Sequence, residues 1–314
     1  MNKEIFRLIS HYDSIVIIRH KHPDYDAYGA QFGLAFALKR HFPKKRIIPA
    51  GDDNDLNQFG ALEIMDPDVL KRSLLIILDT SVKQMLEDEF YLVADKVVIL
   101  DHHQNSSDIP NALFYQNTMA SSTAEMVVRF LMDNDIPIDK EAARALFMGI
   151  VGDTGRFLFS NVKPDTFRIA ATLLETGLDL PSIYQSMYQE SFAQKLAKAE
   201  YLVATKRTRN NVGFGQITPD FLNRHQLDPY SASRMFANQL SGTREIPIWG
   251  NFTEAIEDGV ILCELRSREI PIVEVAKKYG GGGHLLACGC RVASWEMVDQ
   301  ILADLDDLLE GIHG

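Results

Sequence analysis

The sequence has few cysteines, no long apolar run and no excess of positive charge. Its three cysteines, Cys263, Cys288 and Cys290, all lie in the last quarter of the chain. The Cys-x-Cys pair lacks the second pair of ligands that a structural zinc site needs. This scarcity argues against a disulfide-rich secreted scaffold, and we expect reduced, mostly buried thiols in a cytoplasmic protein.

No stretch approaches the roughly 20 apolar residues of a membrane helix, and the apolar run near the N-terminus is interrupted by Arg19 and His20. We therefore expect neither a signal peptide nor a membrane partner. Acidic residues number 43 against 32 Lys and Arg residues, which gives a formal net charge of −11. This balance argues against long duplex nucleic acid as a partner, but local arginines and bound cations can still attract small phosphorylated ligands.

What the chain does have is 314 residues of ordinary globular composition, 46% hydrophobic and 24% charged, enough for two domains. Over residues 1–188, short Val/Ile/Leu runs alternate with helical patterns. This alternation predicts an α/β domain with a doubly wound, mostly parallel sheet. Residues 189–201 form a charged, Ala-rich amphipathic stretch that we interpret as an interdomain linker. Residues 202–314 predict a second, smaller α/β domain.

The periodicity also predicts the main elements within these domains. Strands are expected over residues 14–20, 46–51, 74–79, 96–101 and 211–218, and on both sides of a turn at 258–259. Helices are expected over residues 31–40, 121–133, 141–151, 164–175, 182–188, 229–240, 272–279 and 295–309. The helix at 142–151 is strongly apolar, which leaves a homodimer open.

Three of the predicted strands run directly into side chains that can bind metal. The strands over 14–20 and 74–79 end in His20 and Asp79, and the strand from residue 96 ends in an Asp-His-His triplet at 101–103. Ligands of parallel α/β sheets gather at the carboxyl ends of the strands. We therefore expect these side chains to form one compact site.

Three more carboxylates follow elements of the same domain. Asp24 and Asp26 lie a few residues beyond the first strand, and Asp153 stands in a Gly-flanked turn after a predicted helix. Two carboxylates about 4 Å apart repel by about 4 kcal/mol at an effective dielectric near 20. Gathering these three with Asp79 therefore calls for cations. The mixture of imidazole and carboxylate suits Mn²⁺, or Fe, Co or Zn ions, better than Mg²⁺.

Taken singly, each of these residues has a simpler explanation. An Asp at a strand end is ordinarily a turn or cap residue, and a lone loop histidine is ordinarily solvated, which is how we interpret His22, His41 and His225. The joint pattern carries the hypothesis. In particular, the adjacent imidazoles His102 and His103 beside a carboxylate have no packing rationale.

The second domain contains two features suited to phosphate. Gly280–Gly283, followed by His284, offers a run of backbone N–H groups that can surround an anion, although an isolated Gly run is more often a flexible turn. Upstream, Arg266 and Arg268 alternate with apolar residues and share one face of a predicted strand. Such a pair is usually only solvated, but guanidinium groups bind phosphate well.

Together these motifs resemble the DHH phosphoesterase family. The order H-x3-D-x-D, Asp after a strand, D-H-H and G-D-T-G resembles its catalytic domain, and GGGGHLLACG resembles the GGGH element of the accompanying DHHA1 domain. The chain length, HHQN and GDTGRF are similar to the nanoRNase and pAp-phosphatase branch. The resemblance spans essentially the whole chain.

The resemblance implies roles for individual residues. His20 and Asp24 would hold one Mn²⁺, Asp26, His102 and Asp153 would hold a second, and Asp79 would bridge both. Asp101 would orient a neighbouring imidazole, and His103 would contact the scissile phosphate or protonate the leaving oxygen. Substrate would be held by Arg266, by Ser267 or Arg268, and by Gly281, Gly282, Gly283 and His284, across an interdomain cleft.

The activity that the resemblance implies is two-metal hydrolysis of short RNA or DNA oligonucleotides, 2–5 nucleotides long or of the pApA type, to nucleoside 5′-monophosphates. The same site would convert 3′-phosphoadenosine 5′-phosphate (pAp) to AMP and phosphate. A manganese-dependent inorganic pyrophosphatase and a RecJ-like single-strand exonuclease share the catalytic pattern and stay open as alternatives. A non-catalytic nucleotide-binding sensor is a further alternative, against which the intact ligand set argues.

Overall fold

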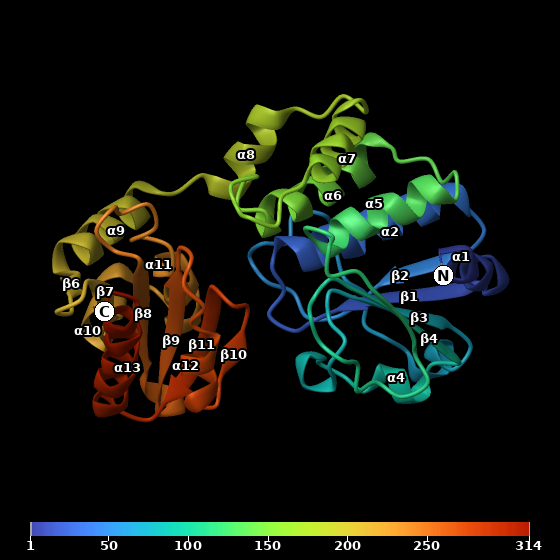
Figure 1. Cartoon of the computed structure of the whole chain (residues 1–314). Helices are drawn as coiled ribbons and strands as arrows, with labels where there is room; N and C mark the ends of the chain where they lie inside the picture. Colours follow the sequence, from blue (N-terminus) through green and yellow to red (C-terminus); the bar gives the residue numbers. More distant parts are fainter. Residues whose placement is uncertain (1, 314) are drawn as a thin grey trace. The chain divides into compact units, whose positions relative to one another are not determined.

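The computed structural model describes residues 2–313, which divide into two compact units (Figure 1). The first unit ends at Gln189 and the second begins at Glu190. Each unit has its own sheet and its own apolar core. The α/β fold class with a second, smaller α/β unit is therefore confirmed.

The first unit is built on a five-stranded sheet in which every strand pair is parallel. Its strands are β1 (Ser14–Arg19), β2 (Arg46–Pro49), β3 (Leu74–Leu78), β4 (Lys96–Asp101) and β5 (Leu113–Gln116). Their spatial order is β2-β1-β3-β4-β5. Each of the three inner strands contains an unbroken run of Val, Ile and Leu residues, as is typical of strands whose two faces are both buried.

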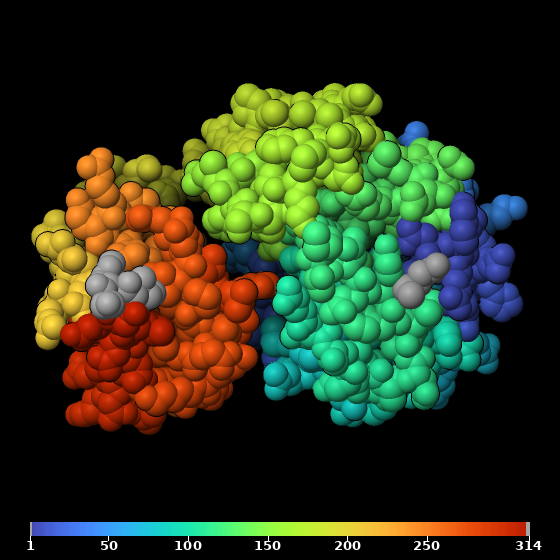
Figure 2. All heavy atoms as spheres, viewed as in Figure 1, coloured from blue at the N-terminus to red at the C-terminus, as the bar shows by residue number. Residues whose placement is uncertain are grey.

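Helices cover both faces of this sheet, as a doubly wound fold requires. They are α1 (Asn2–His11), α2 (Tyr25–His41), α3 (Pro67–Leu70), α4 (Phe90–Val93), α5 (Thr123–Asp133), α6 (Lys140–Asp153), α7 (Pro164–Leu174) and α8 (Leu180–Tyr188), with a 3-10 turn η1 (Lys83–Met85). Ile15 and Ile17 pack with the face that α1, α2, α5 and α6 cover. Val16 and Ile18 pack toward α3 and α4 on the other face. In the space-filling view, α7 and α8 lie at the outer surface of this unit (Figure 2).

A close contact between α2 and α6 brings two parts of the predicted site together. A Cβ atom at Gly29 would lie 2.5 Å from the carbonyl oxygen of Ala145, and one at Gly149 would lie 3.1 Å from Asp26 Oδ1. Only glycine permits this separation of the helix backbones. Asp26, near the start of α2, and Asp153, at the end of α6, are positioned by this contact.

The second unit contains a mixed six-stranded sheet in the order β10-β11-β9-β8-β7-β6. Its strands are β6 (Lys206–Arg207), β7 (Val212–Ile217), β8 (Ile248–Ala255), β9 (Val260–Ser267), β10 (Gly282–Gly283) and β11 (Ala287–Val292). Its helices are α9 (Phe192–Ala204), α10 (Pro219–His225), α11 (Pro229–Phe236), α12 (Val273–Lys278) and α13 (Trp295–His313), with a 3-10 turn η2 (Ile256–Asp258). The largest cluster of its core joins α12 and α13 to β8, β9 and β11.

The stretch that we interpreted as a linker is largely helical. α9 buries Ala197 and Tyr201 in a cluster with Ile217 and Phe236, so it packs with the second unit. The division into domains at 1–188 and 202–314 stays a prediction.

Three expectations about exposure can be compared with the structure. All three cysteines are buried and unpaired. The apolar residues 142–151 of α6 are covered by the unit's own helices rather than presented to a second copy. Across residues 2–313, no helix combines the length and apolarity needed to cross a membrane.

Candidate metal centre

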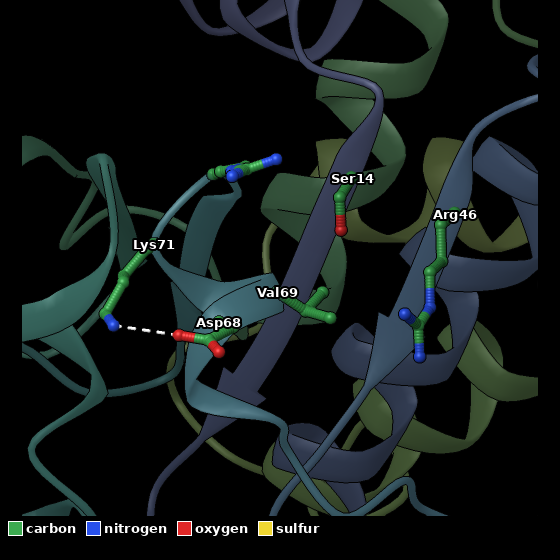
Figure 3. Close-up of a pocket in the computed structure, with 6 residues that line it drawn as sticks. Ser14, Arg46, Asp68, Val69 and Lys71 are labelled. Carbon is green, nitrogen blue, oxygen red and sulfur yellow. Dashed lines mark hydrogen bonds and ion pairs between the residues drawn. The ribbon is translucent and has the colours of Figure 1, made fainter.

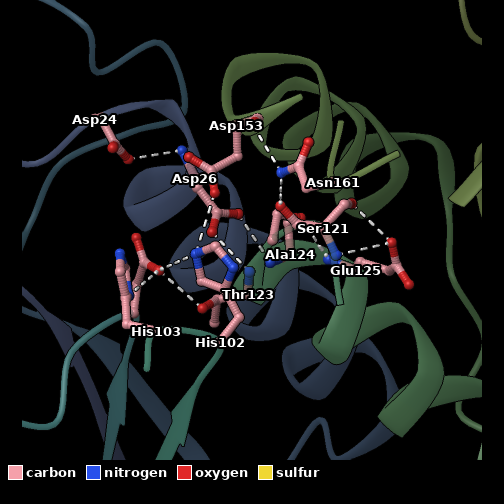
Figure 4. A network of polar contacts seen from close by, with 12 residues as sticks. Asp24, Asp26, His102, His103, Ser121, Thr123, Ala124, Glu125, Asp153 and Asn161 are labelled. Atoms are coloured by element: carbon pink, nitrogen blue, oxygen red, sulfur yellow. Dashed lines mark hydrogen bonds and ion pairs between the residues drawn. The ribbon is translucent and has the colours of Figure 1, made fainter. Parts of the chain in front are cut away.

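The six predicted metal ligands lie together at the carboxyl edge of the parallel sheet. Figure 4 shows Asp24, Asp26, His102 and Asp153 among them. His20, Asp79 and His102 directly follow β1, β3 and β4, because the carboxyl ends of parallel strands meet at one edge. Asp24 caps the N-terminus of α2, and its Oδ1 accepts hydrogen bonds from the backbone N–H groups of Asp26 and Ala27. Asp153 completes the cluster from the end of α6.

His20, Asp24 and Asp79 form one group of three candidate ligands. The Nδ1 of His20 donates to the carbonyl oxygen of Lys21 at 2.8 Å, which leaves Nε2 to face the carboxylates. That Nε2 lies 3.4 Å from Asp79 Oδ2 and 4.0 Å from Asp24 Oδ1. A backbone hydrogen bond therefore fixes the tautomer that a metal ligand needs.

Asp26, His102 and Asp153 form a second group. The Nε2 of His102 lies 3.1 Å from Asp153 Oδ2 and 3.6 Å from Asp79 Oδ1. Asp79 thus presents Oδ2 to the first group and Oδ1 to the second, which is the geometry of a bridging carboxylate. We define the two groups as the first triad (His20, Asp24, Asp79) and the second triad (Asp26, His102, Asp153).

The backbone at Asp79 is held in an uncommon conformation. Its φ is +64°, in the left-handed region that costs a non-glycine residue free energy and is tolerated best by Asp and Asn. The residue is 3% exposed, and its N–H donates to the carbonyl oxygen of Leu100 at 3.0 Å. This strained turn at the end of β3 aims the carboxylate between the two triads.

Asp26 is held by the start of another helix. Its Oδ2 accepts the backbone N–H of Thr123 at 2.7 Å and its Oδ1 accepts that of Ala124 at 2.8 Å. These amides at the N-terminus of α5 have no partners within their own helix, and the helix dipole favours negative charge there. Even so, burial and the neighbouring Asp79 and Asp153 raise the pKa of Asp26 well above its usual value.

Both candidate imidazole ligands have raised pKa values. Burial alone would lower the pKa of each, but the surrounding carboxylates outweigh it. Asp79 and Asp24 raise the pKa of His20 to about 9, and Asp153 and Asp79 raise that of His102 to about 10. These imidazoles therefore bind a proton more readily than a free histidine does, and a cation bound there would displace it.

The donor set fits divalent metal ions. The Nε2 atom of His102 is buried and has no hydrogen-bond partner of acceptable geometry, although Asp153 Oδ2 is only 3.1 Å away. An imidazole nitrogen that faces carboxylates without a well-aligned hydrogen bond can give up its proton and bind a cation together with them. Two divalent ions would also offset the four negative charges of Asp24, Asp26, Asp79 and Asp153.

Asp101 and His103 form a hydrogen-bonded pair beside the two triads. Asp101 is fully buried, and its Oδ1 accepts both the backbone N–H of His103, at 3.0 Å, and the ring Nδ1–H, at 2.7 Å. Burial lowers the pKa of His103, but Asp101 and Asp79 outweigh it and raise that pKa. Because Nδ1 is engaged by Asp101, any reaction with substrate would use Nε2.

The raised histidine pKa values predict how pH affects the metal-free protein. Between pH 6.5 and about 9 the folded state binds more protons than the unfolded state. The contribution of His20 and His102 to the free energy of unfolding is therefore complete near pH 6.5 and is lost as the pH rises. We expect the melting temperature of EDTA-treated protein to fall by about 3 °C or more over this range. Saturating Mn²⁺ should abolish the fall, and a rise in the metal-free protein would contradict the assignment.

Three residues near the cluster were not predicted from the sequence. Thr123 contacts Asp79 through its hydroxyl group, and the side chain of Asn161 donates to the carbonyl oxygen of Asp153 at 3.2 Å. Arg19 is fully buried and donates to the carbonyl oxygen of His20 at 3.3 Å. Only Arg19 left a signal in the sequence, as a charged residue inside an apolar strand.

The predicted substrate-binding side chains of the second unit lie at the end of β9. The guanidinium of Arg266 pairs with Glu264 at 2.9 Å, and that of Arg268 donates to a loop carbonyl oxygen at 2.6 Å. Ser267 is buried and accepts the backbone N–H of Ile270 at 2.9 Å. Both arginines are thus held by contacts within their own unit, and their role toward substrate stays a prediction.

The glycine run adopts a conformation that requires glycine. Gly280 and Gly283 have φ values of +74° and +132°, and a Cβ atom at Gly281 would lie 2.1 Å from the carbonyl oxygen of Gly289. Gly282 and Gly283 form the short edge strand β10 against β11. His284 follows in the exposed turn between these two strands. The close packing of Gly281 is a structural reason for glycine, independent of phosphate binding.

A surface pocket at the opposite, amino-terminal edge of the first sheet contains none of the candidate residues (Figure 3). Ser14 and Arg46, the first residues of β1 and β2, line it together with Asp68, Val69, Lys71 and Arg72. Its Asp68 and Lys71 form an exposed ion pair at 2.8 Å. Exposed pairs of this kind contribute little to stability.

The first unit has a cluster of Asp and His side chains at the carboxyl edge of a parallel sheet, and a second α/β unit follows it in the chain. These features are those of a two-domain α/β protein with a candidate metal centre. The chain belongs to the DHH family: residues 14–150 match the DHH family, N-terminal domain, and residues 225–311 match the DHHA1 domain. Membership of this family, expected from the motifs, is confirmed.

Several relatives resemble nearly the whole chain. The bifunctional oligoribonuclease and PAP phosphatase NrnA of Bacillus subtilis is 32% identical over 316 residues, which covers 98% of each chain. The protein of the same name from Mycoplasma genitalium is 29% identical over 96% of this chain and 95% of its own. Among solved structures, an exopolyphosphatase-related protein from Bacteroides fragilis has a TM-score of 0.87, covers 98% of this chain and 97% of its own, and is 22% identical. This last likeness supports the fold alone.

Proposed function

We propose that this protein is a phosphoesterase that uses two divalent metal ions to hydrolyse short oligonucleotides, and pAp to AMP and phosphate. The observation that carries the proposal is the pair of candidate ligand triads, with one oxygen of Asp79 facing each. The names of relatives similar over almost the full chain, oligoribonuclease and PAP phosphatase, support the choice of substrates.

Manganese is the ion that we propose for both positions. The second triad combines two carboxylates with one imidazole, and the first does the same. Such mixed oxygen and nitrogen ligands suit Mn²⁺ better than Mg²⁺, which prefers oxygen and water. Two bound ions would activate water as a nucleophile and neutralise charge on the phosphoryl oxygens.

Two further residues complete the proposed chemistry. The imidazole of His103 would supply a proton to the leaving oxygen from Nε2, since Nδ1 donates to Asp101. The carboxylate of Asp101 holds the ring in that orientation and favours its charged form. The raised pKa of His103 suits a general acid at neutral pH.

The substrate panel that tests this proposal contains pAp, RNAs of two to five nucleotides, pApA, inorganic pyrophosphate and long single-stranded DNA, each with Mn²⁺. We expect turnover of pAp, pApA and the short RNAs, and little turnover of inorganic pyrophosphate or long single-stranded DNA. Preference for pyrophosphate or for long single strands would identify one of the alternative enzymes. No turnover of any substrate, with two ions bound, would favour the nucleotide-binding sensor.

We propose that Arg266 binds a phosphate group of the substrate, together with Ser267 or Arg268 and the loop Gly281–His284. Arg266→Ala should raise KM by about tenfold or more and change kcat little, because a binding contact present in both ground and transition state is lost. Steady-state kinetics with pAp would measure this effect.

The matched control is Arg209→Ala, which removes an exposed guanidinium of the same unit that pairs with Glu310 at 3.1 Å. Its kinetic constants should match those of the unaltered protein. An Arg266 variant with normal KM and a collapsed kcat would contradict the binding role.

A further inference from the structure

Thr123, the first residue of α5, connects the two metal triads. It is fully buried, and its backbone N–H donates to Asp26 Oδ2 at 2.7 Å. Its hydroxyl group donates to Asp79 Oδ1 at 2.8 Å. One residue therefore contacts both a ligand of the second triad and the carboxylate shared between the triads (Figure 4).

The hydroxyl contact is directed at one oxygen of Asp79 only. Oδ1 is the oxygen nearer the second triad, at 3.6 Å from His102 Nε2. Oδ2 faces the first triad, at 3.4 Å from His20 Nε2. A carboxylate oxygen has two lone pairs. Oδ1 can therefore accept the hydrogen bond from Thr123 with one lone pair and bind a cation with the other lone pair.

We propose that Thr123 is a positioning residue that orients Asp79 Oδ1 and thereby sets the affinity of the second triad for its metal ion. Without the hydroxyl, Oδ1 would lose its donor and the carboxylate would be free to turn about its terminal bond. Donors that orient metal ligands typically change metal affinity by about 10–100-fold. The first triad uses Oδ2 and should be affected far less. This inference rests on the proposed two-metal function.

The variant that tests the role is Thr123→Val, which removes the hydroxyl group and keeps the branched shape. Mn²⁺ binding to the full-length, metal-free protein would be measured by titration calorimetry without substrate and fitted to two sites. We expect one binding step to weaken about 10–100-fold and the other to stay within about threefold. Thr123→Ser, which restores the hydroxyl, should bring the weakened step back to within about threefold of the original protein.

Two further variants identify the steps and control for packing. His20→Ala removes a ligand of the first triad only, so it shows which step belongs to that triad. Thr166→Val is the matched control, because Thr166 is equally buried and its hydroxyl donates to a carboxylate outside both triads, Glu125, at 2.8 Å. Its two binding steps should equal those of the unaltered protein.

The outcomes separate this inference from the proposed function. If the unaltered protein binds fewer than two ions at the cluster, the two-metal proposal itself fails. If it binds two, three results would each overturn the role of Thr123: an unchanged isotherm in Thr123→Val, equal weakening of both steps, or the same weakening in Thr166→Val. Circular dichroism of each variant confirms that the folded state is compared.

Discussion

Replacing Asp79 by Asn should lower kcat/KM toward pAp by about 10³-fold or more. The carboxylate faces both triads through separate oxygens, so its loss weakens both ion sites at once. Metal ions stabilise transition-state charge by several kcal/mol, and about 4 kcal/mol corresponds to a factor of 10³. Asn is preferable to Ala because it tolerates the φ of +64° at this position and keeps the side-chain shape.

The matched control for this change is Asp135→Asn. Asp135 also has a positive φ, +53°, but it is exposed and outside the cluster. The Asp135→Asn variant makes the same Asp-to-Asn change at another residue with a positive φ. Its turnover of pAp should equal that of the unaltered protein. If Asp79→Asn is folded and turns over pAp at a rate near that of the control, the bridging role is wrong.

Replacing His103 by Ala should lower kcat by about 10²–10⁴-fold while two Mn²⁺ ions stay bound. General acids contribute rate factors of this size. We assign His103 to proton donation from Nε2, and Asp101 holds the ring through its Nδ1–H at 2.7 Å. A nucleotide p-nitrophenyl ester, whose leaving group needs no added proton, should be hydrolysed by the variant with a much smaller loss.

His225→Ala is the control for this variant, because the Nε2 of His225 also bonds a carboxylate, Glu200, at 2.8 Å, in the second unit. Its kcat should be unchanged. Two results would contradict the role of His103. Loss of one ion in His103→Ala would make the residue a ligand, since it can also be grouped with Asp79 and His102. An equal loss of rate with both kinds of substrate would exclude proton donation.

Much of the fold could be predicted from the sequence because its signals are local. The continuous apolar runs of β1, β3 and β4 mark strands buried on both faces, and in a parallel sheet their carboxyl ends must meet. The placement of His20, Asp79 and His102 at one edge follows from that rule. The helix expected over residues 121–133 corresponds to α5, and the hydroxyl of Ser122 accepts the N–H of Glu125 at 3.0 Å at its start.

The contacts that position these candidate ligands could not be predicted, because they join residues far apart in the sequence. Thr123 lies 97 positions from Asp26 and 44 from Asp79, yet it bonds both. The close approach of α2 to α6 depends on Gly29 and Gly149, each of which alone is only a helix-weakening residue. Residues 189–201, which we interpreted as a linker, include most of α9, and the burial of Ala197 and Tyr201 in this helix depends on tertiary packing that the sequence does not display.

The most direct test of the two-metal centre is a crystal structure of the protein with Mn²⁺, with the ions located by anomalous scattering. We expect two peaks about 3.5–4 Å apart. One should be coordinated by His20 and Asp24, the other by Asp26, His102 and Asp153, with Asp79 bound to both. A single peak, or ions bound by residues outside this set, would contradict the account.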